Sequence, residues 1–208
     1  MADTPPMAEM LTVLKRELAI AKAISGGPAG QEPAYRYLGD PPGKSVIQAY
    51  LHQQQPTELA EDQALPVFYV ELPPLFPDRP PLIEVLSRGL RLPMRGKWKD
   101  RYLSEERVAE QLRARQVELV VLADAHHLSS RPHAVEWLVS YFRHYLNHVP
   151  LVLVGESERM DTLLLWKATA WVVRRFHRIR LPGEPEEREH AETGADLHRM
   201  LGMKDDVE

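Results

Sequence analysis

The sequence contains no cysteine among its 208 residues, which excludes disulfide bonds and metal sites built on thiolates. No stretch is long and apolar enough to cross a bilayer, and the first thirty residues lack the apolar core of a signal peptide. The net charge of -4 argues against a protein held to nucleic acid by its global charge, although a local basic face is compatible with it. These absences favour a globular protein of the cytoplasm.

Strand-like and helix-like segments alternate along the chain. Strands are predicted at residues 34–38, 67–72, 117–124, 149–154 and 176–181, and helices at residues 7–24, 44–55, 78–90, 104–116, 131–147 and 159–174. Because such alternation produces a parallel sheet covered by helices, the sequence predicts an α/β fold of three layers. We expect an N-terminal helix and linker at residues 1–33, a core domain at 34–182 and a charged tail with a short helix at 183–208.

Residues 117–128 form the stretch around which the chain is organised. Their run of aliphatic and β-branched residues suits a strand buried on both faces of a parallel sheet. The run ends in Asp124, and the carboxyl end of such a strand is where open α/β sheets bind ligands. Asp124 is therefore a candidate magnesium-side acid of a nucleotide site. The alternative is an aspartate that only caps the following turn.

A second candidate segment ends in Gly-Lys-Ser at residues 43–45, between a predicted strand and a predicted helix. In a phosphate-binding loop, G-x-x-x-x-G-K-[ST], backbone N–H groups hold phosphate oxygens, the lysine reaches the outer phosphates and the hydroxyl binds magnesium. The candidate nucleotide-binding residues are Gly39, Gly43, Lys44 and Ser45, and the candidate magnesium ligands are Ser45 and Asp124.

This segment departs from the loop pattern in two ways. Counted from Gly39 it is one residue short, and counted back from Gly43 the first glycine is replaced by Leu38. Pro41 and Pro42 lie inside it and supply no N–H groups to a phosphate. The segment favours descent from a phosphate-binding loop more than tight nucleotide binding. An ordinary strand-to-helix turn is the alternative.

Three further groups of residues carry weaker signals. Ser157 lies just past a predicted strand, where a side chain would contact a terminal phosphate, and Arg174 and Arg175 end a helix from which an arginine could reach a neighbouring subunit. The candidate DNA-binding residues, from the most basic segment of the chain, are Arg95, Lys97, Trp98 and Lys99. His126, His127 and His133 do not have metal-ligand spacing, so we interpret them as turn and surface residues.

The order of these segments resembles the TniB and TnsC group of AAA+ transposition ATPases. The resemblance lies in PVFYVELPP at residues 66–74, VVLADAHHLSSRPHAVEWLVSYFRHYLNHVPLVLVGESE at 120–158 and RRFHRIRLP at 174–182. It covers about residues 36–182, and residues 120–155 are its most specific part. The resemblance implies a P-loop NTPase fold of the AAA+ type, with the lid subdomain largely missing after Pro182.

The resemblance also assigns roles to individual positions. It places Lys44 and Ser45 at the end of the phosphate loop, Ala123 at the Walker B aspartate, Asp124 at the catalytic glutamate, Ser157 near sensor 1 and Arg175 at the arginine finger. It implies ATP and magnesium as cofactors, and further copies of the chain, a transposase and target DNA as partners. The short loop, the alanine and the shortened acid predict weak or absent hydrolysis.

Two functions follow from the resemblance and these departures. The first is a TniB-like regulator that oligomerises, engages target DNA and recruits a transposase, with weak or lost ATP hydrolysis. The second is a catalytically inactive P-loop-fold module that binds a protein partner without nucleotide. A small metabolic kinase is less well supported, since no lid and no arginine cluster for a substrate is evident in the sequence.

Overall fold

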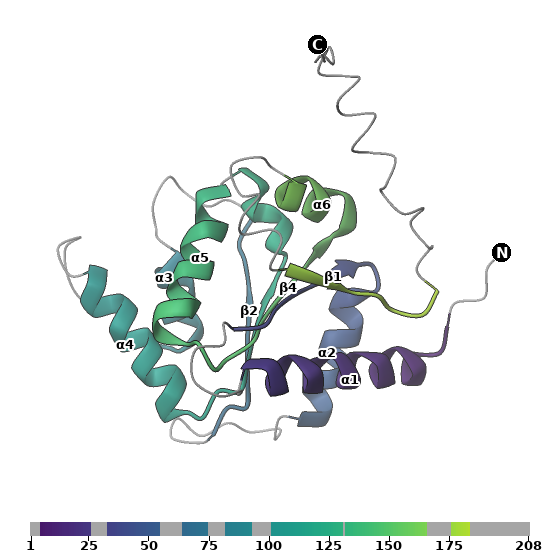
Figure 1. Ribbon diagram of the computed structural model, residues 1–208, viewed down its shortest axis with the longest axis horizontal. Coiled ribbons are helices and arrows are strands. Elements are labelled where there is room, and N and C mark those ends of the chain that lie inside the picture. Colours follow the sequence, from purple (N-terminus) through teal and green to yellow (C-terminus); the bar gives the residue numbers. More distant parts are fainter. Residues whose placement is uncertain are drawn as a thin grey trace, which may run out of the picture. The chain divides into compact units, whose positions relative to one another are not determined.

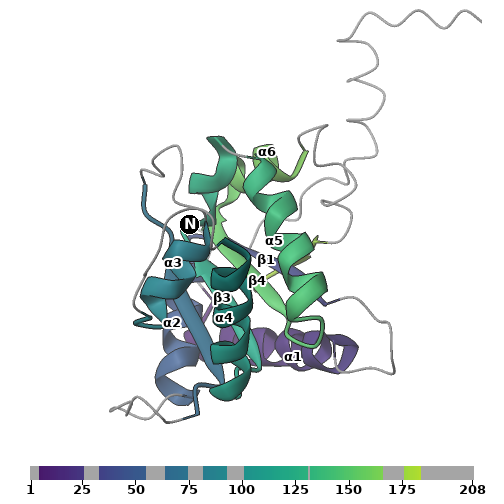
Figure 2. The ribbon, with the colours of Figure 1, turned by 90° about the vertical axis from the view of Figure 1, so that its left-hand side faces the viewer.

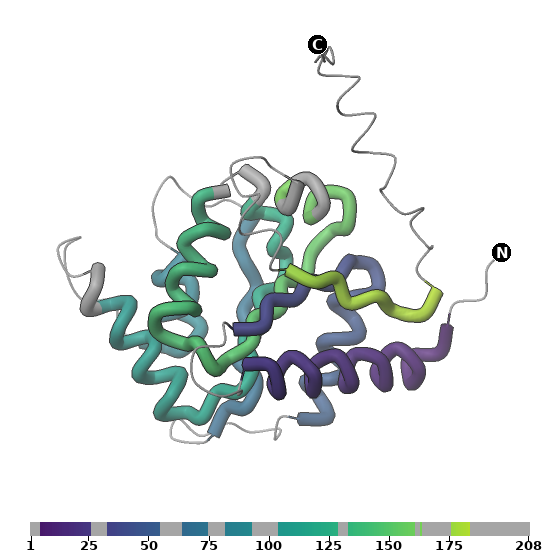
Figure 3. The backbone as a smooth tube through the Cα atoms, viewed as in Figure 1, coloured from purple at the N-terminus to yellow at the C-terminus, as the bar shows by residue number. Residues whose placement is uncertain are grey.

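The computed structural model describes residues 5–25, 33–54, 64–74, 82–92, 101–130, 132–165 and 176–183. Within these residues one sheet has five strands, β1 (Tyr35–Asp40), β2 (Val67–Glu71), β3 (Leu119–Ala123), β4 (Leu151–Glu156) and β5 (Phe176–Ile179). Their order is β2-β3-β4-β1-β5, and every recorded pair is parallel. β1 thus pairs with β5, which lies far along the chain (Figure 3).

The two central strands explain why the sheet has two covered faces. All five residues of β3 are buried, as are the first five of β4. Alternate side chains of a strand point to opposite faces, so Leu119 and Val121 join one apolar cluster while Val120 and Leu122 join the other. Strands that are apolar on both faces are stable only between two layers of helices.

Helices supply both layers (Figure 1). α1 (Met7–Ser25) and α2 (Gly43–Gln54) cover one face and bury the aliphatic side chains that recur at helical spacing. α3 (Leu82–Gly89), α4 (Arg101–Ala114) and α5 (Pro132–Tyr145) cover the other face, as the turned view shows (Figure 2). The predicted α/β fold of three layers, with a parallel sheet between helices, is confirmed. The domain boundaries at residues 33 and 182 stay predictions.

Hydrogen bonds from buried and half-buried side chains join the helices of the second layer to each other and to the sheet. The Trp137 indole N–H donates to the Glu105 carboxylate at 3.1 Å, and the Tyr141 hydroxyl donates to the Glu105 carbonyl at 3.0 Å. The Tyr35 hydroxyl of β1 donates to the Val139 carbonyl of α5 at 3.2 Å. These bonds fix the positions of α4, α5 and β1 relative to one another, since a buried polar group that loses its partner costs about 1–3 kcal/mol.

Several boundaries differ from those predicted, and three affect the site. The strand predicted at 34–38 continues to Asp40, because its last residues pair with Gly155 and Glu156 of β4. The strand predicted at 117–124 ends at Ala123, because Asp124 has a left-handed backbone with φ of 56°. The helix predicted from residue 159 begins at Ser157, as α6 (Ser157–Leu165).

Two other expectations concern helix starts. The helix predicted from residue 104 begins one turn earlier, as α4 at Arg101. The start predicted at residue 78 and the basic segment around Trp98 lie outside the described residues, as do Arg174, Arg175 and the short helix expected in the tail. No helix within the described ranges has the length and apolar character needed to span a bilayer.

Candidate functional site

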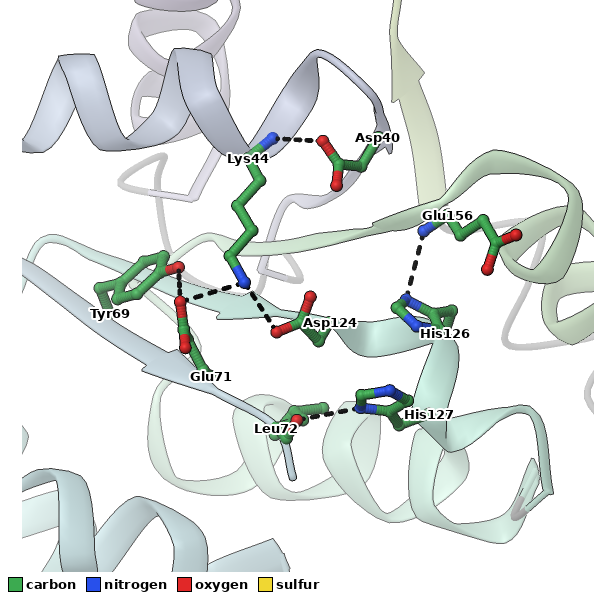
Figure 4. Close-up of polar contacts among 9 residues, drawn as sticks. All are labelled: Asp40, Lys44, Tyr69, Glu71, Leu72, Asp124, His126, His127 and Glu156. Atoms are coloured by element: carbon green, nitrogen blue, oxygen red, sulfur yellow. Dashed lines mark hydrogen bonds and ion pairs between the residues drawn. The ribbon is translucent and has the colours of Figure 1, made fainter. Parts of the chain in front are cut away.

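Four acidic residues lie at one edge of the sheet, where the parallel strands end. Asp40, Glu71 and Glu156 are the last residues of β1, β2 and β4, and Asp124 directly follows β3. Figure 4 draws this edge with the polar contacts among its residues. Open parallel sheets bind ligands in the crevice outside these carboxyl ends, so the edge is the candidate site.

The connection between β1 and α2, where the sequence predicts a phosphate loop, is only two residues long. β1 ends at Asp40 and α2 begins at Gly43, so only Pro41 and Pro42 lie between them. Neither proline has an N–H group. The Lys44 backbone N–H donates to Asp40 Oδ1 at 3.1 Å, which caps the first turn of α2. The chain itself supplies the anion at this helix N-terminus.

Gly39 is a strand residue whose missing side chain leaves room for α6. It pairs with Gly155 of β4, and a Cβ atom at Gly39 would overlap Ser157 Oγ. The same Cβ would lie 3.6 Å from a terminal nitrogen of Arg178 on β5. The structure therefore brings the predicted residues Gly39 and Ser157 together, and adds an arginine that sequence reasoning missed.

Lys44 extends from α2 across the ends of two strands. Its Nζ lies 2.9 Å from Asp124 Oδ2 and 3.1 Å from Glu71 Oε1, and the Tyr69 hydroxyl donates to Glu71 Oε1 at 2.9 Å. The hydrogen bond to Asp124, more than the one to Glu71, raises the pKa of Lys44 above its ordinary value. The ammonium group is therefore held charged between two carboxylates.

Asp124 reaches Lys44 because the chain turns sharply after β3. Side chains alternate along a strand, so Val121 and Ala123 face α2 and the next residue would face the opposite helices. The left-handed backbone of Asp124 breaks this alternation, and aspartate is among the residues that tolerate that conformation. The turn continues into a 3-10 helix, η2 (Ala125–Ser130), whose His127 N–H donates to the Asp124 carbonyl at 3.0 Å.

Glu71 is the second acid of the site, and sequence reasoning missed it. It is the register partner of Ala123 on the neighbouring strand, and both residues face α2. The acid that the resemblance implies at position 123 is absent, while a carboxylate one strand away contacts the same lysine. The signal was an acid at the end of VFYVE, at the carboxyl end of a predicted strand, as with Asp124.

Most of the chain matches one known protein family. Residues 20–185 match the family described as "Bacterial TniB protein". The chain belongs to the TniB family. No curated protein matches it.

Solved structures with similar folds share little sequence with this TniB-family chain. Cdc6p from Pyrobaculum aerophilum is 21% identical, with a TM-score of 0.44 over 86% of this chain and 46% of that one. The Drosophila ORC bound to GC-rich DNA and Cdc6 is 12% identical, with a TM-score of 0.48 over 95% of this chain and 65% of that one. The chain thus spans less than two thirds of the length of either.

The magnesium–ATP that TniB-family membership suggests does not fit these residues in the arrangement that they adopt. The loop between β1 and α2 contributes no free N–H groups from its two prolines, and Asp40 takes the Lys44 N–H. Glu71 and Asp124 take the Lys44 ammonium. Ser45 is exposed in the first turn of α2. The binding roles predicted for Gly39, Gly43, Lys44 and Ser45 stay predictions.

The two histidines after Asp124 connect η2 to the neighbouring strands. The Glu156 backbone N–H donates to His126 Nδ1 at 3.3 Å, which requires that nitrogen to be unprotonated. Burial, followed by the nearby His127, lowers the pKa of His126. His127 Nδ1 lies 3.0 Å from the Leu72 carbonyl oxygen and therefore carries the proton. No group of three or more His, Asp or Glu among the described residues is placed to hold a metal ion.

Proposed function

We propose that this TniB-family chain is a regulator of transposition that assembles with further copies of itself, engages target DNA and recruits a transposase, without effective ATP hydrolysis. Family membership over residues 20–185 supports the place in transposition. The two-residue connection between Asp40 and Gly43 is the observation that carries the loss of hydrolysis.

The loss of hydrolysis follows from the chemistry that the site would have to perform. Phosphoryl transfer is catalysed almost entirely by positioning the phosphates and stabilising the charge that they develop. Here the loop offers no nest of N–H groups, and Ala123 provides no carboxylate for a magnesium shell. Each missing element costs several kcal/mol of transition-state stabilisation, so hydrolysis supported by Lys44 and Asp124 alone is negligible.

A phosphate-release assay with magnesium and ATP tests this part of the proposal. The expected rate is indistinguishable from that of a protein-free blank, both alone and with DNA present. Lys44→Ala is the diagnostic variant, because it removes the lysine that contacts Glu71 and Asp124 (Figure 4). Hydrolysis by the wild-type protein that Lys44→Ala abolishes would contradict the proposal.

Engagement of DNA is proposed through the basic residues Arg95, Lys97, Trp98 and Lys99, which lie outside the described residues. Fluorescence anisotropy with a duplex measures it. Lys97→Ala/Lys99→Ala should weaken binding and lower the slope of log K against log salt by about two, because each phosphate contact contributes about 0.9. Lys15→Ala/Arg16→Ala is the matched control, since it removes the same charge from the exposed face of α1. Equal effects of both variants would contradict the assignment.

Assembly is proposed to use Arg175, whose side chain would reach a neighbouring subunit, and this residue also lies outside the described ranges. Light scattering with and without DNA measures the oligomer. We expect Arg175→Ala to shift the distribution toward the monomer if the arginine contacts a neighbour. An unchanged distribution would contradict this role for Arg175.

A second candidate is an interaction module that binds its protein partner without any nucleotide. This candidate is favoured because carboxylates of the chain already bind both the backbone N–H and the ammonium of Lys44. The two candidates differ in whether DNA affects transposase binding. A pull-down of a purified transposase, with and without duplex DNA, separates them: equal recovery favours the module, and DNA-dependent recovery favours the regulator.

A further inference from the structure

We infer that carboxylates of the chain bind both groups that Lys44 would offer to a nucleotide, its backbone N–H and its ammonium. The carboxylates are those of Asp40, Glu71 and Asp124, so the site is a permanent ion-pair tie between β1, β2 and β3. This inference deepens the proposed function. It rests on one part of it, the assignment of residues 39–45 as a former phosphate loop. It assigns Lys44 a role in holding the sheet together.

The first group is the backbone N–H of Lys44. It donates to Asp40 Oδ1 at 3.1 Å, in the position where a loop of this kind presents an N–H to a phosphate oxygen. A carboxylate at a helix N-terminus is itself stabilised by the helix dipole. An incoming phosphate would have to displace the Asp40 carboxylate from within the same chain, where its effective concentration is high.

The second group is the ammonium of Lys44. Asp124 Oδ2 and Glu71 Oε1 lie 2.9 Å and 3.1 Å from Nζ, and the Tyr69 hydroxyl orients Glu71. Figure 4 shows both carboxylates converging on the end of the lysine side chain. The Lys44 and Asp124 side chains are 28% and 24% exposed, so water screens that pair only in part, whereas Glu71 is half exposed and its pair is screened more strongly. A triphosphate here would lie beside two like charges, which opposes its binding.

The tie joins elements that are distant in the sequence. Lys44 belongs to the helix that follows β1, Glu71 ends β2 and Asp124 follows β3. Among the strand pairs that the structure records, β1 and β2 have no pairing with each other. Lys44 therefore links β1 to β2, the outermost strand on the other side of the sheet. Its removal would leave two carboxylates facing each other without a cation.

This arrangement predicts a different consequence of mutation from that of a nucleotide-binding lysine. A lysine reserved for phosphates contributes little to the stability of the ligand-free protein, and its loss removes the stabilisation by ligand. A lysine tied to carboxylates contributes to the ligand-free protein itself. Thermal unfolding of the full chain without nucleotide therefore tests the inference directly.

We expect Lys44→Met to lower the melting temperature by about 4 °C, because each kcal/mol lost shifts it by about 2–4 °C in a chain of this size. Lys44→Met/Glu71→Gln/Asp124→Asn should recover at least half of that loss, because neutral amides replace the two carboxylates that repel each other in Lys44→Met. Lys22→Met is the matched control, since it breaks the Lys22–Glu118 ion pair of 2.7 Å at the surface. That variant should shift the melting temperature by about 1 °C at most.

Two measurements keep the test decisive if Lys44→Met does not fold. Glu71→Gln leaves Asp124 in place and should lower the melting temperature by about 2 °C. Millimolar magnesium–ATP should leave the melting temperature of the wild-type protein unchanged, since a ligand stabilises only the state that it binds. A Lys44→Met variant as stable as the wild type, or stabilisation of the wild type by magnesium–ATP, would overturn the inference.

These outcomes are separable from those that bear on the proposed function. A stable Lys44→Met variant overturns the tie while leaving the absence of hydrolysis and the role in transposition in place. ATP hydrolysis by the wild type overturns the proposed function whatever the melting temperatures are.

Discussion

Glu71 lies directly opposite Ala123 on neighbouring parallel strands, and its carboxylate contacts Lys44 at 3.1 Å. The strand that the family resemblance assigns to magnesium binding therefore carries no acid at its last residue, while the adjacent strand does. Glu71 of β2 and Asp124, which follows β3, both contact the ammonium of Lys44. The acid count of the site is partly preserved, but its geometry is that of an ion-pair cluster.

Restoring an acid at position 123 should therefore destabilise the protein. Ala123 is fully buried, and Ala123→Asp would place a carboxylate beside Glu71 on the same face of the sheet. Like charges directly opposite each other and the burial of a charge together should cost about 2 kcal/mol in the free energy of unfolding. Urea denaturation measures it, and Ala123→Asn is the uncharged control. An Ala123→Asp variant that gains both stability and magnesium-dependent ATP binding would contradict this prediction.

Alkaline pH should destabilise the protein through Lys44 and Tyr69. The pKa of Lys44 is raised, first by its hydrogen bond with Asp124, and burial raises that of Tyr69 to about 12. A raised pKa in the folded state means that the protonated form is favoured there. The stability that each group contributes is therefore present below its ordinary pKa, 10.5 for Lys44 and 10.0 for Tyr69, and is lost as pH rises through the folded value.

Melting temperatures between pH 8 and about pH 11 check this prediction, with the window set by the ordinary lysine pKa. Lys44→Met/Tyr69→Phe should give a flatter profile than the wild type above about pH 10. Tyr35 and Tyr141, whose pKa values burial also raises, contribute equally to both proteins. Parallel profiles for the wild type and the variant would show that the pair does not contribute.

Mildly acidic pH should weaken the contact between η2 and β4. The folded state lowers the pKa of His126 below 6.5 and uses its unprotonated Nδ1 as an acceptor for the Glu156 N–H. The stability from this neutral imidazole is present above pH 6.5 and decreases as pH falls below it, because the unfolded state binds the proton more readily.

His126→Gln tests this effect, since its amide oxygen can accept the same hydrogen bond without titrating. Chemical denaturation at pH 7 and at about pH 5 should show the wild type losing about 1 kcal/mol more than the variant, the worth of a typical hydrogen bond. His133→Gln is the control, because His133 lies on an exposed face of α5. An equal loss in all three proteins would contradict the role of His126.

Two glycines at the site should differ in their tolerance of a methyl group. A Cβ at Gly155 would lie 2.8 Å from the backbone nitrogen of His126, which cannot move without displacing η2. A Cβ at Gly39 would meet the Ser157 hydroxyl, which can rotate away. We expect Gly155→Ala to cost about 3 kcal/mol and Gly39→Ala about 1 kcal/mol in the free energy of unfolding.

Denaturant unfolding of both variants measures these costs. Gly39→Ala/Ser157→Ala is the informative double variant, because a Cβ at residue 39 lies at an ordinary 3.5 Å from Ser157 Cβ. The loss caused by Gly39→Ala should disappear in the Ser157→Ala background. A larger cost at Gly39 than at Gly155 would mean that the packing around the two strand ends is not as described.

Local pattern was sufficient to predict the architecture. The buried runs of β3 and β4 and the helical spacing of Leu14 and Leu18 in α1 each have one stable environment, a face between two layers. The carboxyl ends of parallel strands meet at one edge, so the sequence alone predicts that Lys44 and Asp124 belong to one site. Glu71 was missed because the sequence does not distinguish an acid that contacts a lysine from an exposed acid that only meets water at the end of a strand.

Sequence alone thus determined the parallel three-layer fold, the TniB resemblance and the place of Lys44 and Asp124 at the carboxyl ends of the strands. Only the tertiary structure decided what those residues do to one another. The length of the β1–α2 connection depends on the pairing of Gly39 and Asp40 with β4, and the direction of Asp124 depends on one left-handed residue. Ion pairs between Lys44, Glu71 and Asp124 depend on side-chain distances across strands, which periodicity does not encode.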